Sequence, residues 1–381
     1  MKVYLRGAAT TKFGELWNIS PRTLVGNAVN DALTQSGLNS KDIQAIFVGN
    51  MLSGALGNQE HLGAFFAEEL GMIVPAMRVE GACASGGLAM HAGVLAALSG
   101  SYENVLVVGV EKMTDYQPEE VASLLMGAGS EAEREAGATF PALYALIARA
   151  HMEKYGTTEE EMAAVSVKNH YHASLNSHAH FTSPVTIKKV LRSPVVASPL
   201  KLLDCSPISD GAAAVVISTV KPKSKKHVAI VASSVSTDTL GLSERHDLTT
   251  LQSAVRASSN AYEIAGIGPK DVDVAEVHDC FTIAEIIAME DLGFFPRGIA
   301  GKSILEGETR IGKKLVVNIS GGLKASGHPV GATGVKQIVE TYQQLLGIAG
   351  PKQIQGARVG LTHNVGGSGA TAVIHILALQ S

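Results

Sequence analysis

Two segments of the chain each run from an apolar stretch through a glycine-rich turn into the start of a helix. The first, AMRVEGACASGGLAMHAGVLAAL, places Cys83 at the turn, and the second, KLVVNISGGLKASGHPVGATGVKQIVE, places His328 at the corresponding turn. Free backbone N–H groups and the positive end of a helix dipole lie at such a turn. They are expected to push a thiol there toward thiolate, its nucleophilic form. The two turns predict a Cys–His pair and acyl-transfer chemistry.

Shorter stretches of the two halves also resemble each other, which indicates an internal duplication. AVNDALTQSGLNSKDIQAIFVGN in the first half is similar to ASSNAYEIAGIGPKDVDVAEVHD in the second. Gly37 matches Gly266, and a Lys-Asp pair follows each of these glycines at the same spacing. The repeat predicts two similar halves, residues 1–220 and 227–381, separated by the exposed basic run KPKSKK.

Apolar runs typical of buried strands alternate with amphipathic helices in both halves. Such alternation predicts an α/β fold with largely parallel sheets and with helices on both faces. Residues from about 115 to 200 break the pattern, because they have no counterpart in the second half and are rich in helix formers, Glu and His. We expect this insert to form a lid or loop domain over the substrate site.

Composition narrows the class of protein further. A net charge of −4 disfavours a nucleic-acid binder, which would more often be basic. Three cysteines, an odd and sparse set, argue against a disulfide framework and for a reducing compartment. Neither a signal-peptide core nor an apolar run of the roughly 20 residues that a membrane span needs is evident. We expect a cytoplasmic protein that binds neither nucleic acid nor membrane.

Two further motifs supply partners for the Cys–His pair. The segment VHDCF places His278 and Cys280 two residues apart at the end of a predicted strand, so both side chains project the same way. The segment THNVGGSG is a glycine-rich turn whose backbone N–H groups suit a developing oxyanion. Two thiols, two histidines and a glycine turn suit the condensation of thioesters.

The motifs together resemble the thiolase superfamily over essentially the whole chain. They are GACASGG, DGAAAVVIS, HDCF, GGLKASGHPVGATG and HNVGGSG. Other thiolases have Asn-Glu-Ala-Phe in place of HDCF and a cysteine in place of His363. Both departures are similar to the sterol-carrier-protein-type and archaeal-type acetoacetyl-CoA thiolases. The resemblance implies two duplicated βαβαβαββ halves in a layered αβαβα structure.

The resemblance also implies roles for individual residues. Cys83 is similar to the nucleophile that accepts the acyl group, and His328 to the histidine that activates it. Cys280 resembles the acid/base cysteine that takes the α-proton of the second acyl-CoA. His278 stands where an asparagine of other thiolases helps to form the first oxyanion hole.

A second oxyanion hole is implied at the N–H groups of Cys83 and of the turn near Gly366. Val365 occupies a position that is glycine in other thiolases, so the identity of the contributing N–H stays open. His363 has two readings: a hydrogen-bonded structural residue that replaces the missing thiol, or a catalyst.

The activity implied is that of an acetyl-CoA C-acetyltransferase of the mevalonate pathway, acting on coenzyme A thioesters without a metal or redox cofactor. The resemblance further implies a homodimer or a dimer of dimers. Hydroxymethylglutaryl-CoA synthase and a small bridging protein are implied as partners.

Other side chains carry simpler interpretations. Cys205 lacks a glycine frame and is interpreted as structural. Four histidines of the insert suggest a metal site, but no recognisable ligand pattern completes it. An alternating polar stretch of this kind is usually a solvated loop. The four are His170, His172, His178 and His180.

Rival functions stay open at this point. A ketoacyl synthase also uses one cysteine with two histidines, but would not need Cys280. A hydroxymethylglutaryl-CoA synthase would want a carboxylate base, for which Glu111 and Glu276 are available. A cysteine hydrolase of the α/β type wants glycine where the chain has Ser85. A longer-chain 3-ketoacyl-CoA thiolase and a non-catalytic subunit of a thiolase complex are the remaining alternatives.

Overall fold

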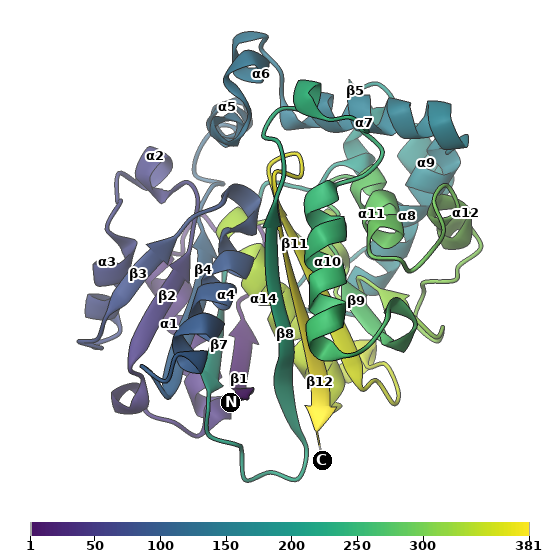
Figure 1. Cartoon of the computed structure of the whole chain (residues 1–381). Helices are drawn as coiled ribbons and strands as arrows, with labels where there is room; N and C mark the ends of the chain where they lie inside the picture. Colours follow the sequence, from purple (N-terminus) through teal and green to yellow (C-terminus); the bar gives the residue numbers. More distant parts are fainter. Residues whose placement is uncertain (1, 381) are drawn as a thin grey trace.

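The computed structural model describes residues 2–380 and contains one ten-stranded sheet (Figure 1). In spatial order the strands are β10 (Val316–Val317), β9 (Val274–Glu276), β11 (Val359–Gly366), β12 (Thr371–Gln380), β8 (His227–Thr237), β1 (Val3–Thr10), β7 (Gly211–Ser218), β4 (Asn104–Glu111), β2 (Ala45–Gly49) and β3 (Ala76–Val79). A separate hairpin consists of β5 (Val195–Ala197) and β6 (Leu200–Lys201).

The two halves of the sheet repeat each other. Read inward from either edge, the order is β3-β2-β4-β7-β1 on one side and β10-β9-β11-β12-β8 on the other. The halves join where β1 and β8 pair antiparallel, with Val3 opposite Ile230. The prediction of a largely parallel sheet is wrong for the centre, where the pairs from β4 through β11 are antiparallel. The physical reason is that no crossover helix separates β11 from β12, which follow each other through a tight turn.

Helices cover the sheet in layers. In chain order they are α1 (Pro21–Ser36), α2 (Ser53–Gly57), α3 (Leu62–Glu69), α4 (Ser85–Leu98), α5 (Pro118–Leu125), α6 (Glu131–Glu135), α7 (Phe140–Tyr155), α8 (Glu159–Ala173), α9 (Ile187–Leu191), α10 (Gln252–Ala265), α11 (Thr282–Asp291), α12 (Ala300–Leu305), α13 (Gly322–Ser326) and α14 (Val330–Leu346). A core shared by both halves of the sheet surrounds α4 and α14. The outer face of the first half packs against α1 and α3, and that of the second against α10 and α11.

The insert is mostly part of the body of the protein rather than a lid. Tyr144 and Ile147 of α7 and Val165 of α8 lie in the same core as Ile283 of α11. In Figure 1 it is α5 and α6 that project from one end of the molecule. The expectation of a lid over the substrate site is therefore wrong for α7 and α8, because they carry apolar residues that need burial against the second half.

Two of the four histidines of the insert differ from the expected solvated loop. His170 and His172 lie on α8 and are buried. His172 Nδ1 lies 3.0 Å from the carbonyl oxygen of Asn318, and its Nε2 accepts from the N–H of Ile311 at 3.2 Å. This ring therefore ties the insert to the second half. No helix within residues 2–380 is both long and apolar enough to cross a membrane.

Candidate active site

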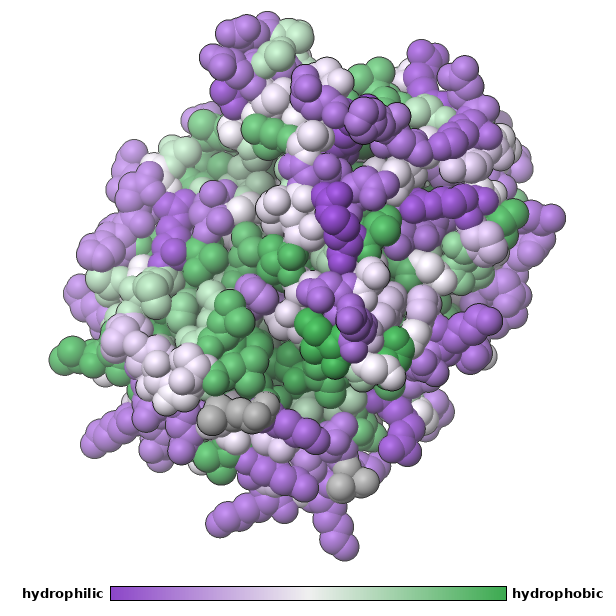
Figure 2. All heavy atoms as spheres, in the orientation of Figure 1, coloured by the Kyte–Doolittle hydropathy of each residue, from purple (hydrophilic) through white to green (hydrophobic). Residues whose placement is uncertain are grey.

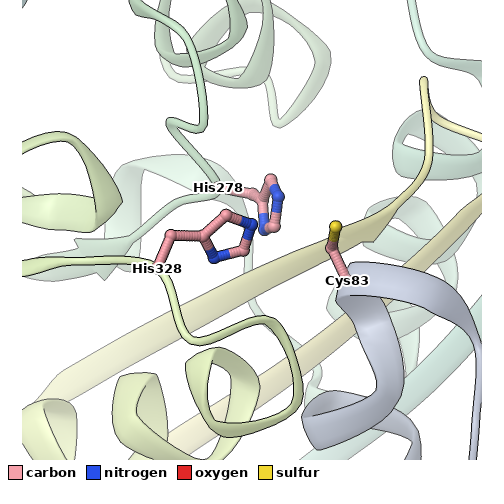
Figure 3. A group of neighbouring side chains, drawn as sticks. All are labelled: Cys83, His278 and His328. Atoms are coloured by element: carbon pink, nitrogen blue, oxygen red, sulfur yellow. The ribbon is translucent and has the colours of Figure 1, made fainter. Parts of the chain in front are cut away.

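Three side chains from distant parts of the sequence meet at one end of the central helices. Cys83 precedes α4, His328 precedes α14, and His278 follows β9. The Cys83 sulfur and one ring nitrogen of each histidine all lie within 4.8 Å of one another. Figure 3 shows the two imidazole rings side by side, facing the sulfur at the start of α4. The structure thus brings together the Cys–His pair that the two glycine-rich turns predicted.

The turn that carries Cys83 is strained and locally braced. Ala82 has φ 54°, a left-handed conformation that residues other than glycine rarely adopt. The Ser85 hydroxyl braces it, since it accepts from the N–H of Gly81 at 3.0 Å and donates to the carbonyl of Ala82 at 2.6 Å. Strain of this kind persists where the surrounding structure fixes a functional geometry. Here it presents the partly buried thiol to the histidines.

The environment of Cys83 differs from the one expected from its place at a helix start. Burial raises the pKa of this thiol to about 12, and the nearby Glu111 carboxylate acts in the same direction. Hydrogen bonds from the N–H groups of Gly367 and of Cys83 itself lower the pKa, but by less. The resting nucleophile is therefore a thiol, and the expected stabilisation as thiolate is wrong for the free protein. A neighbouring base has to remove the proton.

His328 is placed to be that base. Its backbone N–H donates to the Ser209 hydroxyl at 3.3 Å, and its Nδ1 lies 2.7 Å from the Thr333 hydroxyl. Burial lowers its pKa to about 3, so the ring is neutral and able to take a proton at neutral pH. Its Nε2 has no hydrogen-bond partner in the protein.

The HDCF segment is fixed by its aspartate. Asp279 accepts from the N–H of Leu323 at 2.6 Å and from that of Lys324 at 3.2 Å, at the start of α13. These bonds hold both neighbours of Asp279, His278 and Cys280, at the site. Both are buried. Burial lowers the pKa of His278 well below its usual value, and the nearby His328 and His363 add to this effect.

Cys280 lies near the nucleophile in a closed environment. Burial raises its pKa well above the usual value, and the proximity of Cys83 raises it further. The Tyr144 hydroxyl beside the thiol opposes this shift. That hydroxyl donates its hydrogen to the carbonyl of Gly367 at 3.3 Å, and the tyrosine ring packs on Phe281 with centroids 4.7 Å apart. The insert therefore supplies one wall of the site.

The glycine turn after β11 contributes the N–H of Gly367, which identifies the group that the sequence left open. Gly366 itself packs against the backbone at Gly81, whose carbonyl oxygen a methyl group on Gly366 would approach to 2.4 Å. The hydrogen bond to the Cys83 sulfur comes from Gly367, which has a left-handed φ of 63°. Glycine is needed there because that φ turns the N–H toward the thiol.

His363 and Asn364, both on β11, contact the residues of the site. Nδ1 of His363 accepts from the backbone N–H of His278 at 3.4 Å. The Asn364 amide nitrogen donates to the Cys83 carbonyl at 3.0 Å and lies 3.2 Å from Nδ1 of His278. These contacts connect the glycine turn to both the nucleophile and the HDCF segment.

The two glutamates considered as alternative bases are engaged elsewhere. Glu111 accepts hydrogen bonds at both oxygens, among them the N–H groups of Met51 and Gly331, each at 3.0 Å. Glu276 accepts from the N–H and the hydroxyl of Ser320. Both carboxylates fix backbone turns, so neither has a free oxygen directed at a substrate.

Cys205 stands apart from the group. It pairs with Phe281 in an isolated backbone bridge, and Ser206 donates to the carbonyl of Cys280 at 2.9 Å. Its contribution is to hold the HDCF strand end, in keeping with a structural role.

The same cluster is also the one group in residues 2–380 whose His, Cys, Asp or Glu ligand atoms lie close enough to hold a metal ion. One thiol and two imidazoles suit a soft ion such as Zn²⁺. The histidines of the insert form no such group within the described chain. The expectation of a metal-free enzyme stays a prediction.

Sequence reasoning assigned no role to several residues that the structure places in the site. Thr333 and Asn364 lie inside motifs that were recognised, but nothing in the sequence gives their hydrogen-bond partners. Tyr144 has no sequence signal at all, because the insert that carries it has no counterpart in the second half.

Comparison with known proteins accords with this architecture. Residues 3–221 match the family model described as thiolase, N-terminal domain, and residues 234–379 match the one described as thiolase C-terminal domain-like. An acetyl-CoA acetyltransferase of Methanothermobacter thermautotrophicus is 46% identical over 376 residues, which cover 98% of each chain.

Two other relatives extend the comparison. Sterol carrier protein 2 of Bos taurus is 30% identical over 98% of this chain and 71% of its own length. The solved structure of an Ltp2-ChsH2(DUF35) aldolase superposes with a TM-score of 0.82 at 23% identity, over 99% of this chain and 97% of that chain. By its sequence motifs, its family matches and its relatives, the chain belongs to the thiolase family and has the thiolase fold.

Proposed function

We propose that the protein is an acetyl-CoA C-acetyltransferase, which condenses two acetyl-CoA molecules reversibly to acetoacetyl-CoA and CoA. The observation that carries the proposal is the meeting of Cys83, His278 and His328 within 4.8 Å, with the second thiol, Cys280, buried beside them. A hydrolase needs one nucleophile and one base. A second thiol near the first has a use in forming or breaking a carbon–carbon bond.

In the first half-reaction, His328 takes the proton of the Cys83 thiol at Nε2 as the sulfur attacks the acetyl-CoA carbonyl. The new carbon–sulfur bond replaces the bond to CoA, and the protonated His328 returns the proton to the departing CoA thiolate. The oxygen that becomes negative is stabilised by backbone N–H groups at Cys83 and Gly367. The product is an acetyl thioester on Cys83.

In the second half-reaction, Cys280 in its thiolate form takes the α-proton of a second acetyl-CoA. The resulting carbanion attacks the acetyl group on Cys83, whose sulfur leaves as a thiolate and takes the proton that Cys280 had removed, which returns Cys280 to its thiolate form. The Tyr144 hydroxyl can turn from the Gly367 carbonyl to donate to this thiolate, which favours the charged form against burial. His278 is suited to stabilise the enolate oxygen, since its Nε2 has no partner in the protein.

The same residues suggest the substrate class. Cys83 packs against a small cluster that includes Leu52, Met113 and Val330, which favours the smallest acyl group, acetyl. Every proton transfer and every bond change above is supplied by the protein and by CoA thioesters. We therefore propose that the reaction needs no further cofactor.

The experiment is to incubate the protein with acetyl-CoA and to measure the acetyl adduct by mass spectrometry and acetoacetyl-CoA by chromatography. Cys83→Ala should abolish both. Cys280→Ala should still form the adduct on Cys83 but lose condensation by about 10²–10⁴, the usual contribution of a general base. Cys205→Ala is the matched control and should retain both. Acetoacetyl-CoA production by Cys280→Ala at the unchanged rate would assign the base elsewhere.

We also propose a homodimer, or a dimer of such dimers, formed along the edge of the sheet at β3. This strand pairs on one side only, with β2. Ile73 just before it is fully exposed, and Leu95 on the adjacent α4 is 53% exposed. Figure 2 shows apolar side chains gathered over α4 and in the groove toward α10, whose lining includes Leu98 and Ile264. An apolar face of this kind favours a protein partner.

A larger assembly and a compartment belong to the same proposal. The aldolase that shares the fold is paired with a DUF35 protein. This supports a small bridging protein, and through it hydroxymethylglutaryl-CoA synthase, as partners of the present chain. All three cysteines are free. Two reactive thiols side by side would need a reducing compartment such as the cytoplasm.

A further inference from the structure

Two histidines face the nucleophile with a ring nitrogen that has no partner in the protein. These atoms are Nε2 of His278 and Nε2 of His328. Both rings are buried, and burial lowers the pKa of each, so both are neutral at neutral pH. A neutral imidazole carries a single proton, so the partner of Nδ1 decides whether Nε2 donates or accepts.

Asn364 determines which ring nitrogen of His278 carries the proton. Its Oδ1 accepts from the backbone N–H of Gly87 at 3.0 Å, which fixes the orientation of the amide. The Nδ2 group then donates one hydrogen to the Cys83 carbonyl and directs the other at Nδ1 of His278, 3.2 Å away. An amide nitrogen has no lone pair to offer, so Nδ1 of His278 accepts. Its proton resides on Nε2, which faces the site as a donor.

Thr333 determines the tautomer of His328, and here the proton lies on the other ring nitrogen, Nδ1. Its hydroxyl donates to the Pro329 carbonyl at 3.1 Å and lies 2.7 Å from Nδ1 of His328. A hydroxyl has one hydrogen, and this one is used in the bond to Pro329. Toward His328 the hydroxyl therefore accepts, and Nδ1 carries the proton. Nε2 of His328 then faces the site as a lone pair.

We infer that Asn364 and Thr333 are positioning residues that hold His278 and His328 in opposite tautomers. The inference rests on the proposed function for the identity of the reacting groups. The lone pair of His328 can accept the thiol proton of Cys83, and the N–H of His278 can donate to a thioester oxygen. Exchanging either tautomer would leave the site with two donors or with two acceptors.

The same reasoning settles the two readings of His363. Its Nδ1 accepts from the backbone N–H of His278, so its Nε2 also carries a proton. That bond uses the lone pair of Nδ1, and Nε2 carries the proton, so His363 has no free lone pair with which to accept a further proton. We therefore assign His363 as a donor and not as the base that removes the α-proton.

Asn364→Asp tests the inference for His278. One oxygen of the introduced carboxylate still accepts from Gly87, but the other accepts where the amide donated. His278 then places its proton on Nδ1, and its Nε2 loses the hydrogen that faced the thioester. Condensation should fall by about 10²–10³, the usual effect of losing one oxyanion donor. The defect should lessen at low pH, because protonation of the carboxylate or of the ring restores Nε2–H.

A spectroscopic measurement separates this effect from simple misfolding and needs no substrate. Protein labelled with ¹⁵N in its imidazole rings should show His278 protonated at Nε2 and His328 protonated at Nδ1, with His278→Asn and His328→Asn variants to assign the signals. Asn364→Asp should move the proton of His278 to Nδ1. Identical tautomers for the two rings in the unaltered protein, or an unchanged His278 in Asn364→Asp, would overturn the inference.

Thr333 offers a matched pair of variants. Thr333→Val removes the acceptor at nearly constant volume and should slow the acetylation of Cys83 about tenfold or more. The upper limit is the loss of about 10²–10⁴ that follows removal of a general base. Thr333→Ser keeps the hydroxyl and should retain most of the rate. Equal rates in both variants would overturn the role of Thr333. If the two rings have opposite tautomers but the protein never forms acetyl-Cys83, the proposed function is refuted. The inference about the tautomers would still hold.

Discussion

Gly334 of α14 lies against Gly87 of α4 so closely that a methyl group on Gly334 would be 2.2 Å from the Gly87 backbone nitrogen. The two central helices thus meet backbone to backbone just after the turns that carry Cys83 and His328. Without a side chain between them, the helix starts approach closely enough for the thiol and the imidazole to interact.

Gly334→Ala should therefore damage both the fold and the site. Overpacking of this kind costs about 1–3 kcal/mol of unfolding free energy, measured by urea denaturation, and pushes the helix starts apart. The acetylation rate of Cys83 should fall with it. Gly26→Ala in α1 is the control, because a methyl group there meets nothing within 4 Å. A loss of stability in the control as large as in Gly334→Ala would contradict the steric argument.

Alkylation of Cys83 by iodoacetamide should rise about tenfold per pH unit from pH 7 to pH 10, with no plateau. The reason is that burial raises the pKa of this thiol to about 12, so the thiolate fraction keeps increasing through that range. Glutathione, measured alongside, should level off at about pH 9, near the ordinary thiol pKa. Peptide mapping identifies the site. A plateau at Cys83 near pH 7 would show that the helix start and His328 stabilise the thiolate after all.

Local sequence patterns predicted the parts of the site that depend on local geometry. The glycine-rich turn before a helix pointed to Cys83 and to His328, and the spacing of two residues after a strand placed His278 and Cys280 together. The internal repeat predicted that the two turns would be equivalent, and the repeated strand order of the sheet accounts for their meeting.

What the sequence did not reveal depends on contacts across long separations. Tyr144 reaches Gly367 across 223 positions, and no repeat or motif marks it. The sequence favours a thiolate at Cys83 because a helix start is a local feature, whereas the burial that keeps the thiol protonated depends on tertiary structure. The antiparallel centre of the sheet was missed because apolar runs do not distinguish parallel from antiparallel neighbours.

Tyr144→Phe should slow condensation about 10-fold to 100-fold while leaving acetylation of Cys83 within about threefold. The hydroxyl lies beside Cys280 and can turn from the Gly367 carbonyl to donate to the thiolate, and a hydrogen bond to a charged group contributes about 1.5–3 kcal/mol. The ring stays, so its packing on Phe281 is preserved. Burst and steady-state measurements separate the two steps. An equal loss in both steps would indicate that Tyr144 supports the site as a whole.

Ile73→Lys should convert the dimer to a monomer. A lysine beside the β3 edge blocks pairing with a second sheet and places a charge in the apolar face. Ile348→Lys is the control, because that residue is also exposed, at 57%, but follows α14. Light scattering during size-exclusion chromatography gives the mass. A dimer that survives Ile73→Lys, or a monomer in the unaltered protein, would refute the proposed interface.

Acid should destabilise the fold through histidines that are buried in the neutral form, and His375 isolates the effect outside the active site. Its Nε2 lies 3.2 Å from the Gly87 carbonyl, and its Nδ1 has no partner. Burial lowers its pKa to about 3, below the value of about 6.5 expected in the unfolded chain. Below pH 6.5, His375 therefore binds a proton in the unfolded chain but stays neutral in the folded protein.

The stability contributed by this neutral ring is complete above pH 6.5 and declines as the pH falls toward 3, by up to about 1.4 kcal/mol per pH unit. His375→Gln removes the titrating group, so the fall in unfolding free energy between pH 6.5 and pH 5 should become less steep by about that amount. His61→Gln, at an exposed position, should keep the original slope. Urea denaturation at a series of pH values measures both variants. Equal slopes in His375→Gln and in the unaltered protein would mean that the folded protein accommodates the proton at His375, and that acid acts through other groups.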